Sequence, residues 1–254
     1  NGGRDRMRSC MHETTRGFPR WACFAAAAAL VAAQSLADDR AGLSLAIRQG
    51  NLAVVRAIVE KNPALVKSGD DSGFTPLHIA ATAGGVDIVA YLLDRGADLE
   101  ARTAGGQTPL FQTVPLASQQ AFAYLLKQGA NLNARDNQGK TILQFALAWR
   151  RPAMVDLILQ RGFTVDTAGA SAQELLDEAA NTGIESLVTT LVSRGVVIEP
   201  GTRNGTTLLH SAARGGLPGL ASRLLELGAR TDARDQHGLT ALHLAAFYGR
   251  DAVI

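Results

Sequence analysis

Apolar residues return every 33 positions along this chain. A leucine and a glycine recur at this interval in every repeat, and a threonine two positions before the leucine recurs in every repeat but one. A fixed period of this length predicts a solenoid, in which each repeat is one supersecondary unit that buries its apolar face against its neighbours. The leucines of the pattern are Leu77, Leu110, Leu143, Leu176, Leu209 and Leu242, and the glycines are Gly96, Gly129, Gly162, Gly195 and Gly228.

The repeat that begins at Asp70 predicts two helices. Thr75 is a suitable N-cap, and Pro76 fits the first helical position, where no backbone N–H is needed. A second helix is expected over about 86–95, and Gly96 favours a left-handed cap after it. The apolar side chains fall on one face of these two helices: Leu77, Ala80, Ala81, Ile88, Val89, Leu92 and Leu93. The expected fold class is an all-α repeat solenoid of helix-turn-helix units joined by short β-hairpin loops.

The repeats divide residues 38–254 into one domain of stacked units. We number them unit 1 (41–69), unit 2 (70–102), unit 3 (103–135), unit 4 (136–168), unit 5 (169–201), unit 6 (202–234) and unit 7 (from 235, a partial unit). Unit 1 lacks the hairpin motif, which is typical of an N-terminal cap. Unit 5 has Glu174 in place of the threonine and Asp177 in place of a histidine. We expect unit 5 to stack and to form the least stable joint.

Two units carry a motif that identifies a family. Unit 2 contains Thr75-Pro76-Leu77-His78, and unit 7 contains Thr240-Ala241-Leu242-His243 followed by Leu244-Ala245-Ala246. With the period, these motifs resemble the ankyrin repeat over about residues 41–254. The resemblance implies that the motif histidines hydrogen-bond to backbone between adjacent units. It also implies that hairpin tips and the exposed ends of the first helices bind partner proteins.

Residues 1–37 predict a signal peptide with upstream residues rather than folded structure. Arg16 and Arg20 precede an apolar run over 21–33, and Ser35-Leu36-Ala37 places small residues before a cleavage point after Ala37. The alternative is an uncleaved membrane anchor, but the run is shorter than the roughly 20 residues that a spanning helix needs. We expect an exported bacterial protein, periplasmic or secreted, without membrane attachment after cleavage. Because the chain stops inside unit 7, we expect a C-terminally truncated fragment.

Charge and cysteine content exclude several classes of partner and cofactor. Lys and Arg number 25 against 23 Asp and Glu, so no strong field favours nucleic acid or an anionic membrane. Cleavage after Ala37 would remove both cysteines, Cys10 and Cys23, and with them any disulfide or zinc–thiolate site. Stability must then come from stacked apolar faces, and we expect a monomer.

Candidate catalytic and metal-binding residues do not converge. His78, His210 and His243 share one register position, so stacking holds them apart, and no second ligand motif accompanies them. Ser211 follows His210 on a predicted helix without the sharp turn of a nucleophile elbow. We predict no catalytic residue, no metal and no cofactor, and therefore a chain that is not an enzyme.

The partner-facing positions implied by the resemblance are those of Ser72, Phe74, Thr82 and Ala83 in each unit. In units 3 and 4 they are Gly105, Gln107, Pro115, Leu116, Gln138, Lys140, Ala148 and Trp149. Large apolar groups and cations at these positions are typical of interface hot spots. The predicted protein-binding residues are Phe74, Leu116, Lys140, Trp149, Arg214, His237, Phe247 and Tyr248.

A structural role is the alternative for some of these side chains. Trp149 would fill space against a neighbouring unit, because Arg150 replaces the helix-ending glycine there. Phe247 and Tyr248 would pack beneath a cap. The leading hypothesis is a non-enzymatic protein–protein interaction scaffold in the periplasm. The alternatives are a secreted effector that binds host proteins, and the targeting arm of an enzyme whose catalytic domain lies beyond residue 254.

Overall fold

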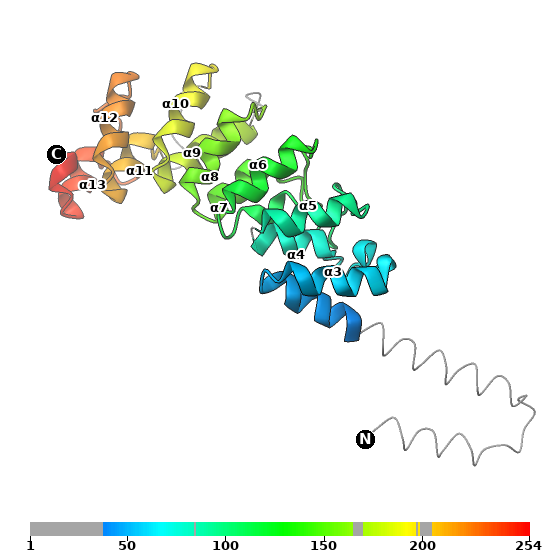
Figure 1. Ribbon diagram of the computed structural model, residues 1–254. Helices are drawn as coiled ribbons and strands as arrows, with labels where there is room; N and C mark the ends of the chain where they lie inside the picture. The colour runs from blue at the N-terminus through cyan, green and yellow to red at the C-terminus, as the bar shows by residue number, and fades with distance from the viewer. Residues whose placement is uncertain (1–37, 84, 165–169, 197, 199–204) are drawn as a thin grey trace, which may run out of the picture.

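The computed structural model describes residues 38–83, 85–164, 170–196, 198 and 205–254. Over these residues the chain forms an elongated, curved stack of helices, with the earliest and latest units at opposite ends (Figure 1). The predicted signal peptide, with its cleavage point after Ala37, lies outside the described residues.

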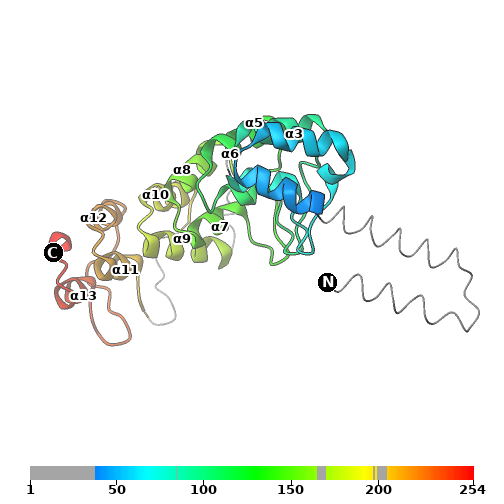
Figure 2. The ribbon, with the colours of Figure 1, turned by 60° about the horizontal axis from the view of Figure 1, so that its bottom comes forward.

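The helices form two rows, as Figure 2 shows. The inner row contains the first helix of every unit except unit 3. It consists of residues 38–48, α4 (Pro76–Ala83), α7 (Ile142–Ala148), α9 (Ala170–Thr182), α11 (Leu208–Gly215) and α13 (Ala241–Phe247). The outer row consists of α3 (Leu52–Lys61), α5 (Val86–Asp94), α6 (Gln119–Lys127), α8 (Pro152–Gln160), α10 (Glu185–Ser193) and α12 (Pro218–Glu226). Short 3₁₀ turns complete the stack at η1 (Pro63–Lys67), η2 (Phe111–Thr113) and η3 (Asp251–Val253).

The leucines of the 33-residue pattern form a continuous buried seam through the stack. Leu77, Leu143 and Leu176 are 0% exposed, and Leu209 is 5% exposed. At the last unit Leu242 is 57% exposed, because no described unit covers it. The buried seam between adjacent units confirms the predicted all-α repeat solenoid.

The helix starts follow from the threonine register. The Thr141 side chain accepts the backbone N–H of Gln144, whose side chain in turn accepts the N–H of Thr141, so both donors are satisfied. Thr207 and His210 form the equivalent pair, as do Thr240 and His243. The threonine before α7, α11 and α13 is therefore the predicted N-cap.

The loops between units are tight turns rather than strands of a sheet. In unit 2 the N–H of Asp70 donates to the carbonyl of Phe74, and the Asp70 carboxylate accepts the N–H groups of Ser72 and Phe74 at 2.9 Å each. Gly73 supplies the positive φ of 78° that this turn requires. Among the described residues one isolated antiparallel bridge, between Arg135 and Thr141, is the extent of β-pairing.

The prediction of an inner α-helix is wrong for unit 3. There the chain forms only η2, with i to i+3 hydrogen bonds such as that from the N–H of Phe111 to the carbonyl of Thr108. Pro115 explains the difference, because proline lacks the N–H that would continue the helix and its ring clashes with the preceding turn.

The inner segments end at one register position with a left-handed residue. Gly183, Gly216 and Gly249 occupy it with φ of 76°, 66° and 61°. Ala117 and Arg150 occupy it in units 3 and 4 with φ of 52° and 50°. These are the two described non-glycine residues with positive φ, so the stack imposes the same chain reversal where glycine is missing.

Unit 5 stacks as predicted although it lacks the threonine cap. Its inner helix α9 is 13 residues long and begins at Ala170, ahead of Glu174, the residue at the threonine position. Leu176, Ala179 and Leu191 are 0% exposed between the neighbouring units. The lower stability of this joint stays a prediction.

Candidate protein-binding surface

The hairpin tips of units 2 to 4 are connected to one another by hydrogen bonds. The N–H of Ala104 donates to the carbonyl of Ser72 at 2.8 Å, and the N–H of Asn137 donates to the carbonyl of Gly105 at 3.0 Å. The Asn137 side chain adds a third bond, from Nδ2 to the carbonyl of Ala104 at 2.9 Å. This edge of the solenoid is therefore held in place before any partner binds.

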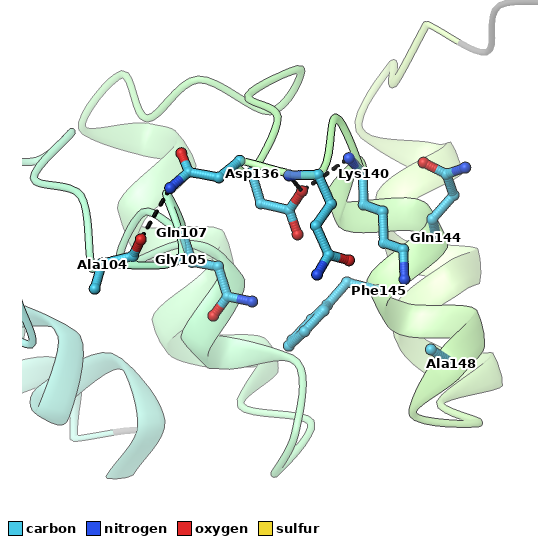
Figure 3. Close-up of a pocket in the computed structure, with 10 residues that line it drawn as sticks. Ala104, Gly105, Gln107, Asp136, Lys140, Gln144, Phe145 and Ala148 are labelled. Carbon is cyan, nitrogen blue, oxygen red and sulfur yellow. Dashed lines mark hydrogen bonds between the residues drawn. The ribbon is translucent and has the colours of Figure 1, made fainter. Parts of the chain in front are cut away.

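A hollow of about 310 Å³ lies between this edge and α7 (Figure 3). Its walls come from the hairpins of units 3 and 4, and its floor comes from the inner helix of unit 4. The residues that line it are Ala104, Gly105, Gln107, Asp136, Asn137, Gln138, Lys140, Gln144, Phe145 and Ala148. The hollow is lined mainly by polar side chains, with Phe145 as the large apolar group of its floor.

The charges at the hollow are not equivalent. The Asp136 carboxylate accepts the backbone N–H groups of Gln138 and Lys140 at 2.9 Å each, so one of its oxygens is engaged inside the hairpin. The Lys140 side chain extends along the hollow toward α7 (Figure 3) and is exposed. Among the described residues no carboxylate lies within ion-pair distance of Lys140. Burial raises the pKa of Glu178 on α9, and the nearby charge of Lys140 opposes that shift.

An aromatic row supports the floor. The Phe145 ring lies 5.7 Å from the Phe111 ring at 64° and 6.1 Å from the Trp149 ring at 55°. Trp149 ends α7 and is 49% exposed. Trp149 therefore packs on Phe145 of its own helix while about half of its side chain stays exposed, and its protein-binding role stays a prediction.

Leu116 lies at the register position of Trp149, one unit earlier, and is 64% exposed. The guanidinium of Arg151 donates to the carbonyl of Pro115 and so connects the turn that carries Leu116 to unit 4. Lys140, Trp149 and Leu116 thus belong to the same two units, and Lys140 lines the hollow directly.

The other predicted binding residues lie elsewhere on the stack. Phe74 is half-buried, with its ring edge-on to His78 at 5.7 Å, so it has a packing role that the sequence did not indicate. Phe247 and Tyr248 are 80% and 46% exposed in unit 7 and pack on each other at 5.1 Å. Arg214 and His237 are exposed in units 6 and 7.

Phe145 and Gln144 were missed as site residues. Phe145 shares its register position with Ile79, Gln112 and Glu178, so one inner-row position carries an aliphatic, an amide, an aromatic and an acidic side chain. Such variation at an otherwise regular position was the available signal. Gln144 was missed because it occupies the position of the motif histidine, where a structural role was expected.

The motif histidines have the structural role that the resemblance implies. Nε2 of His78 lies 3.1 Å from the carbonyl oxygen of Gln107, and Nε2 of His210 lies 3.0 Å from that of Leu239, in each case in the next unit. Within the described ranges no three His, Cys, Asp or Glu side chains are grouped so as to hold a metal ion. In the same ranges no helix has both the length and the apolar character needed to cross a membrane.

Comparisons with known proteins give one consistent family. The family model "Ankyrin repeats (3 copies)" matches residues 23–103 and 176–254, and "Ankyrin repeats (many copies)" matches residues 116–159. Among solved structures, the ankyrin repeat domain of Bcl-3 is 28% identical with a TM-score of 0.59, covering 83% of this chain and 96% of that one. The human ASB11 ankyrin repeat domain is 25% identical with a TM-score of 0.65, covering 83% and 95%.

Curated relatives match over shorter stretches. Human protein phosphatase 1 regulatory subunit 27 is 42% identical over 66 residues, which are 26% of this chain and 42% of that protein. The serine/threonine-protein kinase VIK of Arabidopsis thaliana is 43% identical over 54 residues, which are 21% of this chain and 12% of the kinase. Delta-latroinsectotoxin-Lt1a of Latrodectus tredecimguttatus is 37% identical over 68 residues, 26% of this chain and 6% of the toxin. The chain thus spans less than half of the length of each of these relatives.

Proposed function

Because this chain belongs to the ankyrin-repeat family, we propose that it is a non-enzymatic scaffold that binds a partner protein through its hairpin tips and inner row. The observation that carries the proposal is the hydrogen-bonded hairpin edge of units 3 and 4, which borders the hollow, together with the exposed Leu116 and Trp149 of the same two units. When a partner covers large apolar side chains that are otherwise exposed to water, their removal from water makes the free energy of binding more favourable.

Recovery of partners by the tagged full chain tests this proposal. The tagged protein would be expressed in its native host cells, crosslinked there to bound proteins and then purified. One variant carries Leu116→Ser and Trp149→Ser. The matched control carries Val54→Ser and Leu225→Ser, which replace apolar residues of the outer row that are 42% and 45% exposed. Circular dichroism must show that both variants keep the helical content of the parent.

We expect a partner that copurifies with the parent and the outer-row control and is lost from the inner-row variant. A partner lost equally from both variants, or retained by both, would place binding outside the inner row. If no protein copurifies with the folded parent, the scaffold proposal fails.

Export is a separate part of the proposal and rests on residues 1–37. The basic segment, the apolar run over 21–33 and the small residues before Asp38 are the features that support it. We propose that the scaffold works in the periplasm or after secretion. Mass spectrometry of the N-terminus of the recovered protein tests this directly. A mature chain that begins at Asp38 in the exported fraction supports export, and an intact N-terminus in the cytosolic fraction contradicts it.

A further inference from the structure

The hollow between units 3 and 4 is suited to a single large side chain. Its volume of about 310 Å³ is at the lower end of the range of roughly 300–1,000 Å³ that is usual for ligand pockets. The hairpin hydrogen bonds from Asn137 to Ala104 and Gly105 fix one wall. A side chain that enters therefore meets a preformed surface and loses little free energy to ordering it.

The floor favours an aromatic occupant. Phe145 already packs with Phe111 and Trp149 at tilted or edge-on angles of 64° and 55°. Aromatic rings prefer such geometries with centroids about 4.5–7 Å apart, so another ring above Phe145 would extend the same row. Gln107 and Gln144 border this floor. Their side-chain oxygens already accept bonds from Gln112 and Thr141, so their amide N–H groups are the donors that can bond to the backbone or to a polar ring atom of the occupant.

The charge of the hollow favours a carboxylate beside that ring. Lys140 reaches the hollow with its charge in solvent, and the Asp136 carboxylate is engaged by two backbone N–H groups. Glu178 interacts with Lys140 electrostatically but is not among the hollow's lining residues. A cationic segment would meet Lys140 unfavourably, whereas an acidic one would pair with it.

We propose that this hollow receives an aromatic side chain from a segment of the partner protein, and that an Asp or Glu next to that residue pairs with Lys140. The inference rests on the proposed scaffold function and specifies which partner segments the surface selects.

Selection from a random peptide library displayed on phage tests the inference with the folded full chain as target. Representative enriched peptides are then synthesised, and their affinities are measured by fluorescence anisotropy. Ala148→Phe fills the hollow from an exposed position without removing a buried contact, and Lys140→Glu reverses the charge. Lys127→Glu, at an exposed position on α6 in the outer row, is the matched charge control.

We expect enriched peptides to share an aromatic residue beside Asp or Glu. Ala148→Phe and Lys140→Glu should each weaken their binding by about tenfold, while Lys127→Glu should leave it within about twofold. Enriched peptides that lack the aromatic–acidic pair, peptides that bind Ala148→Phe unchanged, or a failure to enrich any peptide would each overturn the inference. A cellular partner that is lost with Leu116→Ser and Trp149→Ser but kept by Ala148→Phe would leave the scaffold function standing while this inference falls.

Discussion

His78 connects two units of the solenoid through Gln107. Its Nε2–H donates to the carbonyl oxygen of Gln107 at 3.1 Å, while Nδ1 accepts from the Thr75 hydroxyl at 2.8 Å and from the Thr75 backbone N–H at 3.2 Å. The ring is fully buried. One imidazole therefore caps its own helix and bonds to the next unit, and the cap requires the neutral ring, because only an unprotonated Nδ1 can accept a hydrogen bond.

Acid should weaken the contact between His78 and Thr75. Burial is the main cause that lowers the pKa of His78 from its ordinary 6.5. The folded state then binds fewer protons than the unfolded chain. The stabilisation is therefore complete above the pKa of His78 in the unfolded chain, and it is lost as the pH falls toward the lower pKa of the folded state. In urea unfolding between about pH 7.5 and pH 5, His78→Gln, which copies Gln144 of unit 4, should show a smaller loss of stability than the parent. An equal loss in both proteins would exclude His78 as the cause.

Replacing Arg150 by glycine should stabilise the fold. Arg150 holds φ of 50° at a position where units 2, 5, 6 and 7 have glycine. The left-handed conformation costs a non-glycine residue about 1–2 kcal/mol, and the extra entropy of unfolded glycine offsets part of the gain. We expect Arg150→Gly to raise the free energy of unfolding by about 0.5–1 kcal/mol in urea titrations.

The reverse change at the same register position is the control. Gly183→Ala places a Cβ 3.0 Å from Cδ2 of Leu217 at φ of 76°, so it should destabilise the protein. If both substitutions shift stability in the same direction, the register does not determine the preference for glycine.

The sequence predicted the regular part of this molecule and missed its exceptions. The 33-residue period assigned Leu77 and Leu143 to the buried face of each inner helix, and both are buried in the seam. It did not reveal that Pro115 removes an inner helix, or that α9 starts ahead of Glu174, since these are local departures from the repeat. Lys140 was found from its hairpin position. Its neighbour Phe145 was missed because the register alone does not say which inner-row side chains stay accessible.

Asp177 should make the stability of the fold fall as the pH rises, whereas His78 should make it fall as the pH decreases. Burial is the main cause that raises the pKa of Asp177 from its ordinary 3.8, with Glu174 adding to the shift and the hydrogen bond from Gln173 opposing it. The folded state therefore binds more protons than the unfolded chain above pH 3.8, and stability falls as the pH rises from the unfolded value through the folded one.

Asp177→Asn should remove this penalty at neutral pH. The amide keeps an oxygen for the hydrogen bond from Gln173, so the helix contact at 3.3 Å can persist. We expect the variant to gain thermal stability over the parent near neutral pH and to lose that gain toward about pH 4. Glu174→Gln, on the exposed face of α9, is the control for removing a charge without burial. Equal gains from both variants would indicate a general charge effect.

Replacing Thr108 by valine should stabilise the protein, because the Thr108 hydroxyl has no hydrogen-bond partner. The Thr108 side chain is 1% exposed, and its Oγ1 is buried without a hydrogen bond. Phe111 stands where His78 and Gln144 pair with their threonines, so the capping partner is missing in unit 3. An unpaired buried hydroxyl costs roughly 1–3 kcal/mol, and Thr108→Val removes it at nearly constant volume. We expect a gain of about 1 kcal/mol in the free energy of unfolding, measured by urea titration.

Thr141→Val is the matched control, because Oγ1 of Thr141 accepts the N–H of Gln144 at 3.4 Å. That variant should lose about 1 kcal/mol. A loss of stability from Thr108→Val would show that the hydroxyl is satisfied in solution, and the missing partner in unit 3 would then carry no energetic cost.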